Sequence, residues 1–411
     1  MRAIILAAGA GRRMEPLTLT RPKALMELAG ATLIDHGIRA LRGAGAREVC
    51  VVVGHMAEPL IAHLEKSGDG PFDIVRQERP LGTGDALRSA ARHLDKGAVV
   101  VNGDVLVDSA DIARVATAEA RDAEVTMLTA EVADASRYGV VEADAAPEGL
   151  GRVRALAEKP QRPTSHRVNA GVYKFGPEIV GALERLEESP RGEYELTSAL
   201  HPFIAAGRAV AVAARKPWTE VGRPWDLLLA QERLLSSLRG RSDGRVEGGA
   251  VLEGPVFVSK GAIVKSGAYI EGPVFIGEDC RIGPNCYIRG STHIGAGCHV
   301  GAGTEVKNSI LFGHSSAPHL NYVGDSIVGA QVNLGAGTKI ANLRLDEREV
   351  SVTVGGARVG TGLRKFGAII ADGVKTGINA SIDVGTVIGP GAFVGPSARA
   401  SGAIEAGARV L

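Results

Sequence analysis

A repeat of six residues in the second half of the chain constrains its fold more than any other feature. An aliphatic residue recurs at every sixth position from 252 to 306: Leu252, Val258, Val264, Ile270, Ile276, Ile282, Ile288, Ile294, Val300 and Val306. Four residues after each of them stands another small or apolar side chain. A period of six suits neither an α-helix nor a flat sheet, but it is typical of a parallel β-helix built from hexapeptides. We therefore expect residues 248–411 to form a β-helix whose aliphatic side chains point inward.

Composition supports a periodic fold over a disordered one. Glycine accounts for 55 of the 411 residues, and 31 of these 55 lie after residue 245. Disordered glycine-rich tracts lack a strict aliphatic spacing, whereas tight turns between short strands require glycine. Three of the four cysteines, Cys280, Cys286 and Cys298, fall on the small inward position of the repeat. We expect them to be buried structural residues, as we do Cys50 within a run of valines.

The repeat lapses twice. Residues 311–325 are rich in polar groups, and residues 343–367 contain an alternating run, 350–354, followed by Gly355-Gly356. Alternation before a Gly-Gly pair predicts a β-hairpin. Insertions in a repeat protein map to loops, often on the binding face, so both stretches are predicted to leave the repeat.

The first half of the chain predicts an α/β domain. Short β-rich runs at 3–6, 49–53, 98–101 and 125–129 alternate with helical patterns at 31–44, 83–94 and 109–120. This rhythm indicates βαβ units with a mostly parallel, Rossmann-like sheet and helices on both faces, in which ligands bind beyond the carboxyl ends of the strands. The helical pattern of 224–238 gives way near 236–249, so we place the domains at 1–240 and 248–411.

Charge and hydropathy exclude several partners. Forty-seven Lys and Arg balance 46 Asp and Glu, giving a net charge of +1. The chain lacks the excess of basic residues that is typical of proteins that bind nucleic acid. Its apolar runs are far shorter than the roughly 20 residues that a membrane helix needs. Residues 1–6 are too short for a signal peptide, and four cysteines are no disulfide framework. We expect a cytoplasmic protein that binds neither nucleic acid nor membrane.

The segment after the first strand, Leu6–Lys23, suits a triphosphate. Its small residues let backbone N–H groups approach phosphate oxygens, and Arg13 and Lys23 supply positive charge. The Gly-Lys-Ser/Thr ending of a P-loop is missing. This segment resembles the signature of the sugar-1-phosphate nucleotidyltransferases, and the similarity continues along the domain. The resemblance implies nucleotide contacts at Leu6, Ala7, Ala8, Gly9, Gln77, Gly82 and Thr83, and sugar contacts at Gly139, Glu158, Asn169 and Thr197.

The same resemblance implies a magnesium site at Asp104 and Glu220, hard oxygen ligands of the kind Mg²⁺ takes. The family usually has Asp where this chain has Glu220. A sugar-1-phosphate oxygen would attack the α-phosphorus of a nucleoside triphosphate, and pyrophosphate would leave. This step needs alignment and charge neutralisation. Arg13 would stabilise the leaving phosphates and Lys23 the attacking and α-phosphates. Gln77 leaves the choice between uracil and thymine open.

A second motif lies in the repeat region at 319–325 and 333–338. It resembles the acetyltransferase segment of the bifunctional N-acetylglucosamine-1-phosphate uridylyltransferases, whose repeats form a left-handed β-helix. The resemblance places His319 as general base, and a neutral imidazole near pH 7 suits the deprotonation of an amine. Tyr322 and Asn333 would position the amino sugar, and the N–H of Ala336 would stabilise the oxyanion formed from acetyl-CoA.

Two departures from the bacterial enzymes point to an archaeal-type member. Ser315-Ser316-Ala317-Pro318 stands where bacterial members carry a lysine, and the 343–367 excursion is longer than theirs. The resemblance implies a homotrimer that converts glucosamine-1-phosphate, acetyl-CoA and UTP into UDP-N-acetylglucosamine. Galactosamine-1-phosphate remains open as acceptor. The alternative is a nucleotidyltransferase of thymidylyl- or guanylyltransferase type whose β-helix is purely structural.

Overall fold

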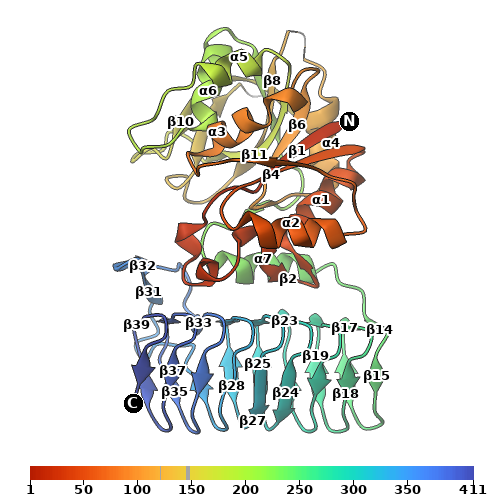
Figure 1. The fold of residues 1–411 in the computed structure, drawn as a ribbon, viewed down its shortest axis with the longest axis vertical. Coiled ribbons are helices and arrows are strands. Elements are labelled where there is room, and N and C mark those ends of the chain that lie inside the picture. Colours follow the sequence, from red (N-terminus) through yellow and green to blue (C-terminus); the bar gives the residue numbers. More distant parts are fainter. Residues whose placement is uncertain (121, 145–148) are drawn as a thin grey trace. The chain divides into compact units, whose positions relative to one another are not determined.

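The computed structural model describes residues 1–120, 122–144 and 149–411 (Figure 1). These residues pack as two compact units that are interleaved along the chain. The first unit comprises Met1–Ala10, Pro22–Leu25 and Leu33–Glu220, and the second comprises Gly11–Arg21, Met26–Thr32 and Val221–Leu411. Two short N-terminal segments therefore pack with the repeat region. The linear division at 240 and 248 stays a proposal from the sequence.

The first unit is built on a nine-stranded sheet in the order β5-β4-β1-β6-β11-β8-β12-β10-β9. Its strands are β5 (Asp73–Arg76), β4 (Glu48–Val53), β1 (Arg2–Leu6), β6 (Ala98–Asn102), β11 (Arg167–Phe175), β8 (Val125–Glu131), β12 (Ala209–Ala213), β10 (Leu150–Glu158) and β9 (Gly139–Ala143). The strands from β5 to β6 are parallel, as is the pair β8 and β12. Strands β11 and β10 run antiparallel to their neighbours. The expected parallel sheet is thus one half of a mixed sheet.

Helices cover both faces of this sheet, as the sequence predicts. One face carries α1 (Leu33–Gly43), α2 (Ala57–Lys66) and α4 (Ser109–Thr117), and the other carries α3 (Thr83–Ser89), α5 (Ile179–Glu184) and α6 (Leu196–Ala205). Ile5 of β1 packs in the first of these cores and Ile4 in the second. Because both faces are buried, the central strands are apolar throughout.

The second unit is dominated by three parallel sheets, named here sheets I, II and III. Sheet I contains β14 (Arg241–Ser242), β17 (Val256–Val258), β20 (Val274–Ile276), β23 (Thr292–Ile294), β26 (Ile310–Leu311), β29 (Ile327–Val328), β33 (Ala368–Ile370), β36 (Thr386–Ile388) and β39 (Ala403–Ile404). Sheet II contains β15 (Arg245–Val246), β18 (Ile263–Val264), β21 (Arg281–Ile282), β24 (His299–Ala302) and β27 (Ser316–His319), and isolated bridges at Asn333 link it to β34 (Lys375–Thr376), β37 (Phe393–Val394) and β40 (Arg409–Val410).

Sheet III contains β16 (Val251–Glu253), β19 (Tyr269–Glu271), β22 (Tyr287–Ile288), β25 (Glu305–Lys307), β28 (Tyr322–Gly324), β30 (Lys339–Ile340), β35 (Ser381–Ile382) and β38 (Arg399–Ala400). In the early coils each strand pairs with the strand 18 residues later, as Val258 pairs with Ile276. Three hexapeptides therefore make one coil, with one strand in each sheet.

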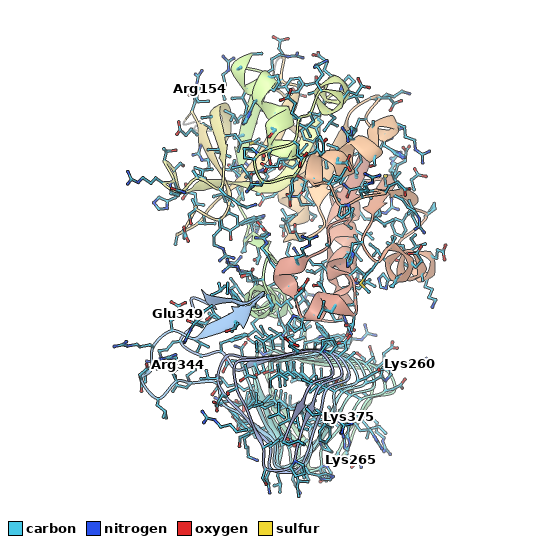
Figure 2. All side chains as sticks on the ribbon, turned by 60° about the vertical axis from the view of Figure 1, so that its left-hand side comes forward. Arg154, Lys260, Lys265, Arg344, Glu349 and Lys375 are labelled. Carbon is cyan, nitrogen blue, oxygen red and sulfur yellow. The ribbon has the colours of Figure 1, made fainter. Side chains whose placement is uncertain are left out.

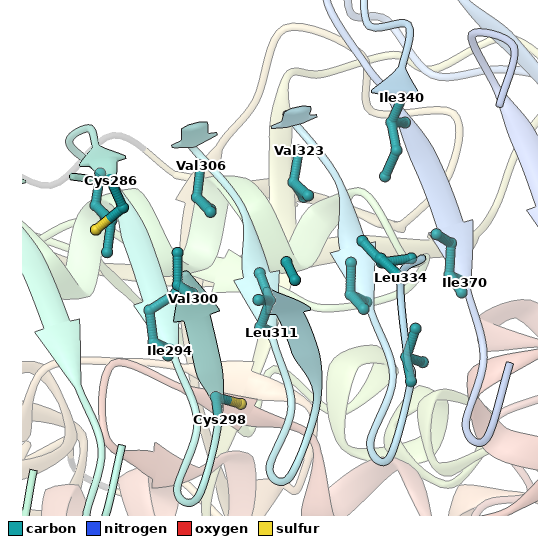
Figure 3. Close-up of a cluster of buried hydrophobic side chains, with 14 of the residues drawn as sticks. Cys286, Ile294, Cys298, Val300, Val306, Leu311, Val323, Leu334, Ile340 and Ile370 are labelled. Carbon is teal, nitrogen blue, oxygen red and sulfur yellow. The ribbon is translucent and has the colours of Figure 1, made fainter. Parts of the chain in front are cut away.

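The inward side chains of the repeat form one continuous core, as predicted (Figure 3). Ile294, Val300 and Val306 are fully buried in it. Cys280, Cys286 and Cys298 lie in the same core as free thiols, and Cys50 is buried in the first unit. Burial raises the pKa of both Cys280 and Cys286 to about 11. The structural role expected for the cysteines is confirmed.

The prediction that residues 311–325 leave the repeat is wrong. Strands β26, β27 and β28 stack on the preceding coil in parallel register, but His299 pairs with Ser316, only 17 residues later. The inward position moves from Val306 to Leu311, five residues instead of six. A pentapeptide in place of a hexapeptide removes one residue from the coil and displaces the sequence register without opening a loop.

The second lapse does leave the coil. Strands β31 (Ser351–Val354) and β32 (Ala357–Gly360) form the predicted antiparallel hairpin around Gly355-Gly356. Figure 2 shows Arg344 and Glu349 on this excursion. The second unit also includes β2 (Glu27–Leu28), β3 (Ala31–Thr32) and helix α7 (Asp226–Leu235), which contacts β2 and β23 beside sheet I (Figure 1). None of the helices in the described ranges combines the length and the apolar character that a membrane-spanning helix requires.

Candidate active sites

The expected nucleotide segment begins where β1 ends, between two parallel neighbours. Leu6 pairs with Val52 of β4 and Asn102 of β6. The Leu6 carbonyl accepts a hydrogen bond from the Gly103 N–H (2.9 Å), and the Ala7 N–H donates to the Val52 carbonyl (2.8 Å). A Cβ on Gly9 would meet no atom within 4 Å, so the backbone is open on that side. The segment Leu6–Gly9 is therefore anchored at one end and accessible at the other.

Two carboxylates meet at this edge of the sheet. The two-residue strands β7 (Val105–Leu106) and β13 (Thr219–Glu220) pair antiparallel, with Glu220 opposite Val105. In this register the backbone of Glu220 lies beside Val105, the residue that follows Asp104. The Lys23 Nζ lies 2.6 Å from the Asp104 Oδ2, and both side chains are partly buried. The structure thus pairs Lys23 directly with Asp104, and it places the backbone of Glu220 next to the residue that follows Asp104.

A buried tyrosine connects these carboxylates with the predicted sugar-contacting residues. The Tyr173 hydroxyl accepts a hydrogen bond from the Asn169 Nδ2 (2.6 Å) across an irregularity in β11. Burial raises the pKa of Tyr173, and the negative charges of Glu158, Glu220 and Asp104 raise it further. Tyr173 is therefore a neutral hydroxyl among three carboxylates. The sequence analysis did not single it out, although it stands four residues after Asn169 on the same strand.

Glu158 is held by charge and by its strand partner. It pairs with Gly139 across β10 and β9, and a Cβ on Gly139 would lie 3.1 Å from the Glu158 Oε2. Lys159 (3.1 Å) and Arg191 (3.4 Å) contact the Glu158 Oε1. Arg191 also pairs with Glu195 at 2.6 Å, just before Thr197 of α6. Arg191 is a second residue that the sequence analysis missed.

The predicted base-reading residues lie around the start of α3, and Thr83 connects this helix to the start of α6. Gln77 is buried after β5, and its Nε2 donates to the Gly82 carbonyl (3.1 Å) and the Asp85 Oδ2 (2.7 Å). The Thr83 hydroxyl accepts a hydrogen bond from the Leu196 N–H (3.1 Å). Both amide hydrogens of Gln77 are used in these two bonds. Within the described residues its Oε1 is therefore the atom that can accept a hydrogen bond from a ligand.

Gly82→Ala should destabilise the first unit. Gly82 has φ +115°, and an added Cβ would lie 2.6 Å from the Tyr194 carbonyl oxygen. Strain in this backbone region costs about 1–3 kcal/mol, and the clash adds to it. Gly45→Ala is the control, because Gly45 also has positive φ but has open space around its Cβ. Thermal unfolding should show a larger loss for Gly82→Ala. Equal losses would mean that the contact with Tyr194 is readily relieved.

Arg13 belongs to the second unit. It is exposed in the 3-10 helix η1 (Arg12–Met14), which follows Gly11 in a left-handed conformation (φ 64°). The Met14 N–H and the Thr18 hydroxyl both donate to the Gly11 carbonyl, at 2.8 and 3.0 Å. The segment thus folds back at Gly11 and presents Arg13 outward.

His319 lies at the edge of the coil between sheets II and III. It ends β27, pairs with Ala302 and has an exposed side chain. Its N–H donates to the buried Asn321 Oδ1 (3.1 Å), and its carbonyl accepts from the Gly337 N–H (3.0 Å). The Asn321 Nδ2 also donates to the Gly335 carbonyl (2.7 Å). These bonds fix the backbone of His319 against the turn that carries Ala336.

The other predicted residues flank this edge. Asn333 is exposed in sheet II between Ser316 and Lys375, and Tyr322 begins the strand of sheet III that follows His319. The Tyr322 hydroxyl accepts from the Asn342 Nδ2 (3.2 Å). On the preceding coil, burial lowers the pKa of His299, and the charges of Arg281 and His319 lower it further.

Comparison with known proteins matches both halves of the chain. The family model described as "Nucleotidyl transferase" matches residues 2–237, and that described as "GMPPB C-terminal domain" matches residues 270–362. A solved structure of UDP-glucose pyrophosphorylase complexed with UDP-glucose covers 57% of this chain and 98% of its own, with a TM-score of 0.54 at 21% identity. That likeness shows the fold of the first unit.

Two relatives align over nearly the whole chain. The Bifunctional protein GlmU of Methanococcus maripaludis is 38% identical over 402 residues, covering 96% of this chain and 93% of the relative. The Bifunctional sugar-1-phosphate nucleotidylyltransferase/acetyltransferase of Sulfurisphaera tokodaii is 37% identical over 400 residues, covering 97% and 96%.

Proposed function

Because the chain belongs to the family of bifunctional sugar-1-phosphate nucleotidylyltransferase/acetyltransferases, we propose that it makes UDP-N-acetylglucosamine in two steps. It acetylates glucosamine-1-phosphate with acetyl-CoA, then transfers UMP from UTP to the product with release of pyrophosphate. The observation that carries the proposal is that full-length similarity coincides with two sets of reactive side chains, one around Asp104 and one around His319. The enzyme is a double transferase.

Uridylyl transfer rests on charge neutralisation by this chain's own residues. A phosphate oxygen of the sugar-1-phosphate attacks the α-phosphorus of UTP, and pyrophosphate leaves. Lys23, held 2.6 Å from Asp104, is a cation placed for the attacking and α-phosphates, and Arg13 is assigned to the leaving phosphates. Glu158 and Asn169 hold the sugar hydroxyls, and Tyr173 supports Asn169 through its hydroxyl.

Asp104 and Glu220 fit a Mg²⁺ ion that arrives with the nucleotide. Mg²⁺ takes oxygen ligands and is commonly held by one or two carboxylates together with substrate phosphates and waters. The described residues hold no group of three or more acidic, histidine or cysteine side chains arranged for a metal, whereas the β7–β13 register supplies two carboxylates. When bound, the ion would neutralise phosphate charge. The buried Asn102 Oδ1, without a partner among the described residues, adds a further oxygen at this edge.

The hydrogen bonds of Gln77 indicate which nucleotide bases it can bind. With its Nε2 turned toward Asp85 and Gly82, Gln77 offers a carbonyl oxygen, which accepts from the imide N–H of uracil or thymine. Cytosine and adenine present a ring nitrogen acceptor at the equivalent position and would leave this oxygen unpaired. Gln77 thus supports UTP over CTP and ATP, but it treats UTP and dTTP alike.

Acetyl transfer uses His319 as general base. Its imidazole takes the proton of the amino group as the nitrogen attacks the thioester carbonyl, and CoA leaves as the thiol. The Ala336 N–H makes no hydrogen bond within the described residues and is free to stabilise the oxyanion. Tyr322 and Asn333 position the amino sugar. Here we assign residues 248–411 to a left-handed β-helix acetyltransferase domain, residues 1–240 to the nucleotidyltransferase domain, and the protein to the cytoplasm.

We predict a homotrimer. His319 and Asn333 are exposed on the single chain, so one chain alone gives acetyl-CoA no enclosing wall. A neighbouring chain would supply one, and closed cyclic symmetry is usual for homo-oligomers. Light scattering should give three times 42.6 kDa. A monomer that still acetylates would contradict this assembly.

Coupled assays test the function directly. Purified protein is supplied with ATP, CTP, GTP, UTP or dTTP, with and without acetyl-CoA. The sugar substrate is the 1-phosphate of glucosamine, galactosamine, glucose or mannose. We expect nucleotide-sugar formation that depends on acetyl-CoA when an amino-sugar phosphate is the substrate. Nucleotide transfer to glucose-1-phosphate or mannose-1-phosphate with no acetyl-CoA-dependent activity would favour the alternative in which the β-helix is purely structural.

A further inference from the structure

The segment Gly11–Arg21, which carries Arg13, has little structure of its own. It contains two 3-10 helices of three residues each, η1 (Arg12–Met14) and η2 (Leu17–Leu19), and it packs within the second unit. Short 3-10 turns satisfy few backbone groups and have no helix or sheet ladder to hold them. The position of such a segment therefore depends on contacts made by its side chains.

Its end is fixed by Asp372, an acidic residue of the coil. The Asp372 Oδ2 accepts hydrogen bonds from the Thr20 hydroxyl (2.7 Å) and from the Arg21 Nη2 (2.8 Å) and Nε (3.3 Å). The Asp372 Oδ1 accepts from the Ala330 N–H of the neighbouring coil (2.7 Å). The carboxylate is thus itself oriented by the coil, and two consecutive residues of the segment bind it.

Arg21 makes two further contacts. Its guanidinium carbon lies 4.7 Å from the centroid of the Phe312 ring, which the arginine helps to bury, and its Nη1 lies 3.8 Å from the Glu27 Oε1. Only 16% of the Arg21 side chain and 18% of the Asp372 side chain are exposed. By contrast, the Arg399–Asp383 pair on the same coil is 74% and 31% exposed. Partly buried charge-assisted bonds hold geometry better than solvated surface pairs.

We propose that Asp372 is a positioning residue for uridylyl transfer. It anchors Thr20 and Arg21 and so sets the placement of the segment that presents Arg13 to the leaving phosphates. This inference rests on the proposed function. It gives the repeat region a part in nucleotide chemistry besides acetyl transfer. Asp372 lies at the edge of the coil between sheets I and II, whereas His319 lies at the edge between sheets II and III.

The test compares Asp372→Asn and Arg21→Met with Asp383→Asn in the full-length protein. Asp383→Asn removes a carboxylate that also binds an arginine on the coil, so it is a matched control. Misplacement of a group by about 1 Å costs on the order of 10²-fold in rate, so kcat/KM for UTP should fall roughly 10–100-fold in both test variants. KM for the sugar phosphate and acetyl transfer should stay within about twofold of wild type.

The double variant Arg21→Met/Asp372→Asn should lose less than the product of the two single losses, because the bond between these two residues is already broken in each single variant. Hydrogen exchange of peptides covering 11–21 should be faster in Asp372→Asn and unchanged in Asp383→Asn. Full UTP activity in Asp372→Asn, or an equal fall in both activities, would overturn the inference, as would unchanged exchange. Hydrogen exchange does not depend on catalysis. If the wild type used no nucleotide, the proposed function would be refuted, and hydrogen exchange would still show whether Asp372 anchors the segment.

Discussion

Asp104→Asn should lower uridylyl transfer by roughly 10²–10³-fold or more, the range seen when one preorganised electrostatic contact is removed, and leave acetyl transfer intact. Asparagine keeps the shape of the side chain but cannot balance the Lys23 ammonium, which now lies 2.6 Å from the carboxylate. It also removes one of the two anionic oxygens available to Mg²⁺. Initial rates of pyrophosphate release at saturating magnesium measure the loss.

Asp144→Asn is the control for this variant. Asp144 also pairs with a cation, Arg154 (Figure 2), but both side chains are exposed on the same unit, so activity should be unchanged. If Asp104→Asn lost both activities while still folded, the two-site description would be wrong. If it retained uridylyl transfer, neither the lysine pairing nor the metal role of Asp104 would stand.

The second large effect concerns His319. His319→Ala should reduce acetyl transfer by roughly 10²–10⁴-fold, the contribution of a positioned general base, with uridylyl transfer unchanged. Added free imidazole should restore part of the acetylation rate in the variant, because it supplies the missing base.

His314→Asn is the matched control, because His314 is exposed on the same coil in a left-handed conformation that asparagine tolerates (φ 62°). A fully active His319→Ala would remove the assigned role and leave the fold untouched. A wild type that acetylates no amino-sugar phosphate would favour the purely structural β-helix.

The period of six predicted the coil because its signal lies in the inward side chains, which burial restricts to small or aliphatic residues. A strict search for the period of six also missed the coils of 17 residues. The spacing from Val306 to Leu311 is five, and the polar residues around His319 and Asn321 looked like a loop. A search that allowed five-residue steps between inward positions would have followed the strands through this region.

The sheet of the first unit shows a different limit. Apolar runs identify strands but do not encode their direction, so the antiparallel strand β11 was not predicted. The meeting of Asp104 and Glu220 depends on the ladder between β7 and β13, two residues each, which is too short to recognise in a sequence. Family motifs supplied these residues, whereas Tyr173 and Arg191 belong to no quoted motif and emerged only from the packing.

The thiols described in the fold have a practical consequence for labelling. All four cysteines are buried, and burial raises the pKa of Cys50 to about 12 and that of Cys286 to about 11. Alkylation requires a thiolate, and a pKa four units above neutral leaves roughly one thiol in 10⁴ ionised at pH 7. We therefore expect the native protein not to react with maleimides. A cysteine introduced at an exposed position such as Ser397 would carry a dye alone, without first removing the natural ones.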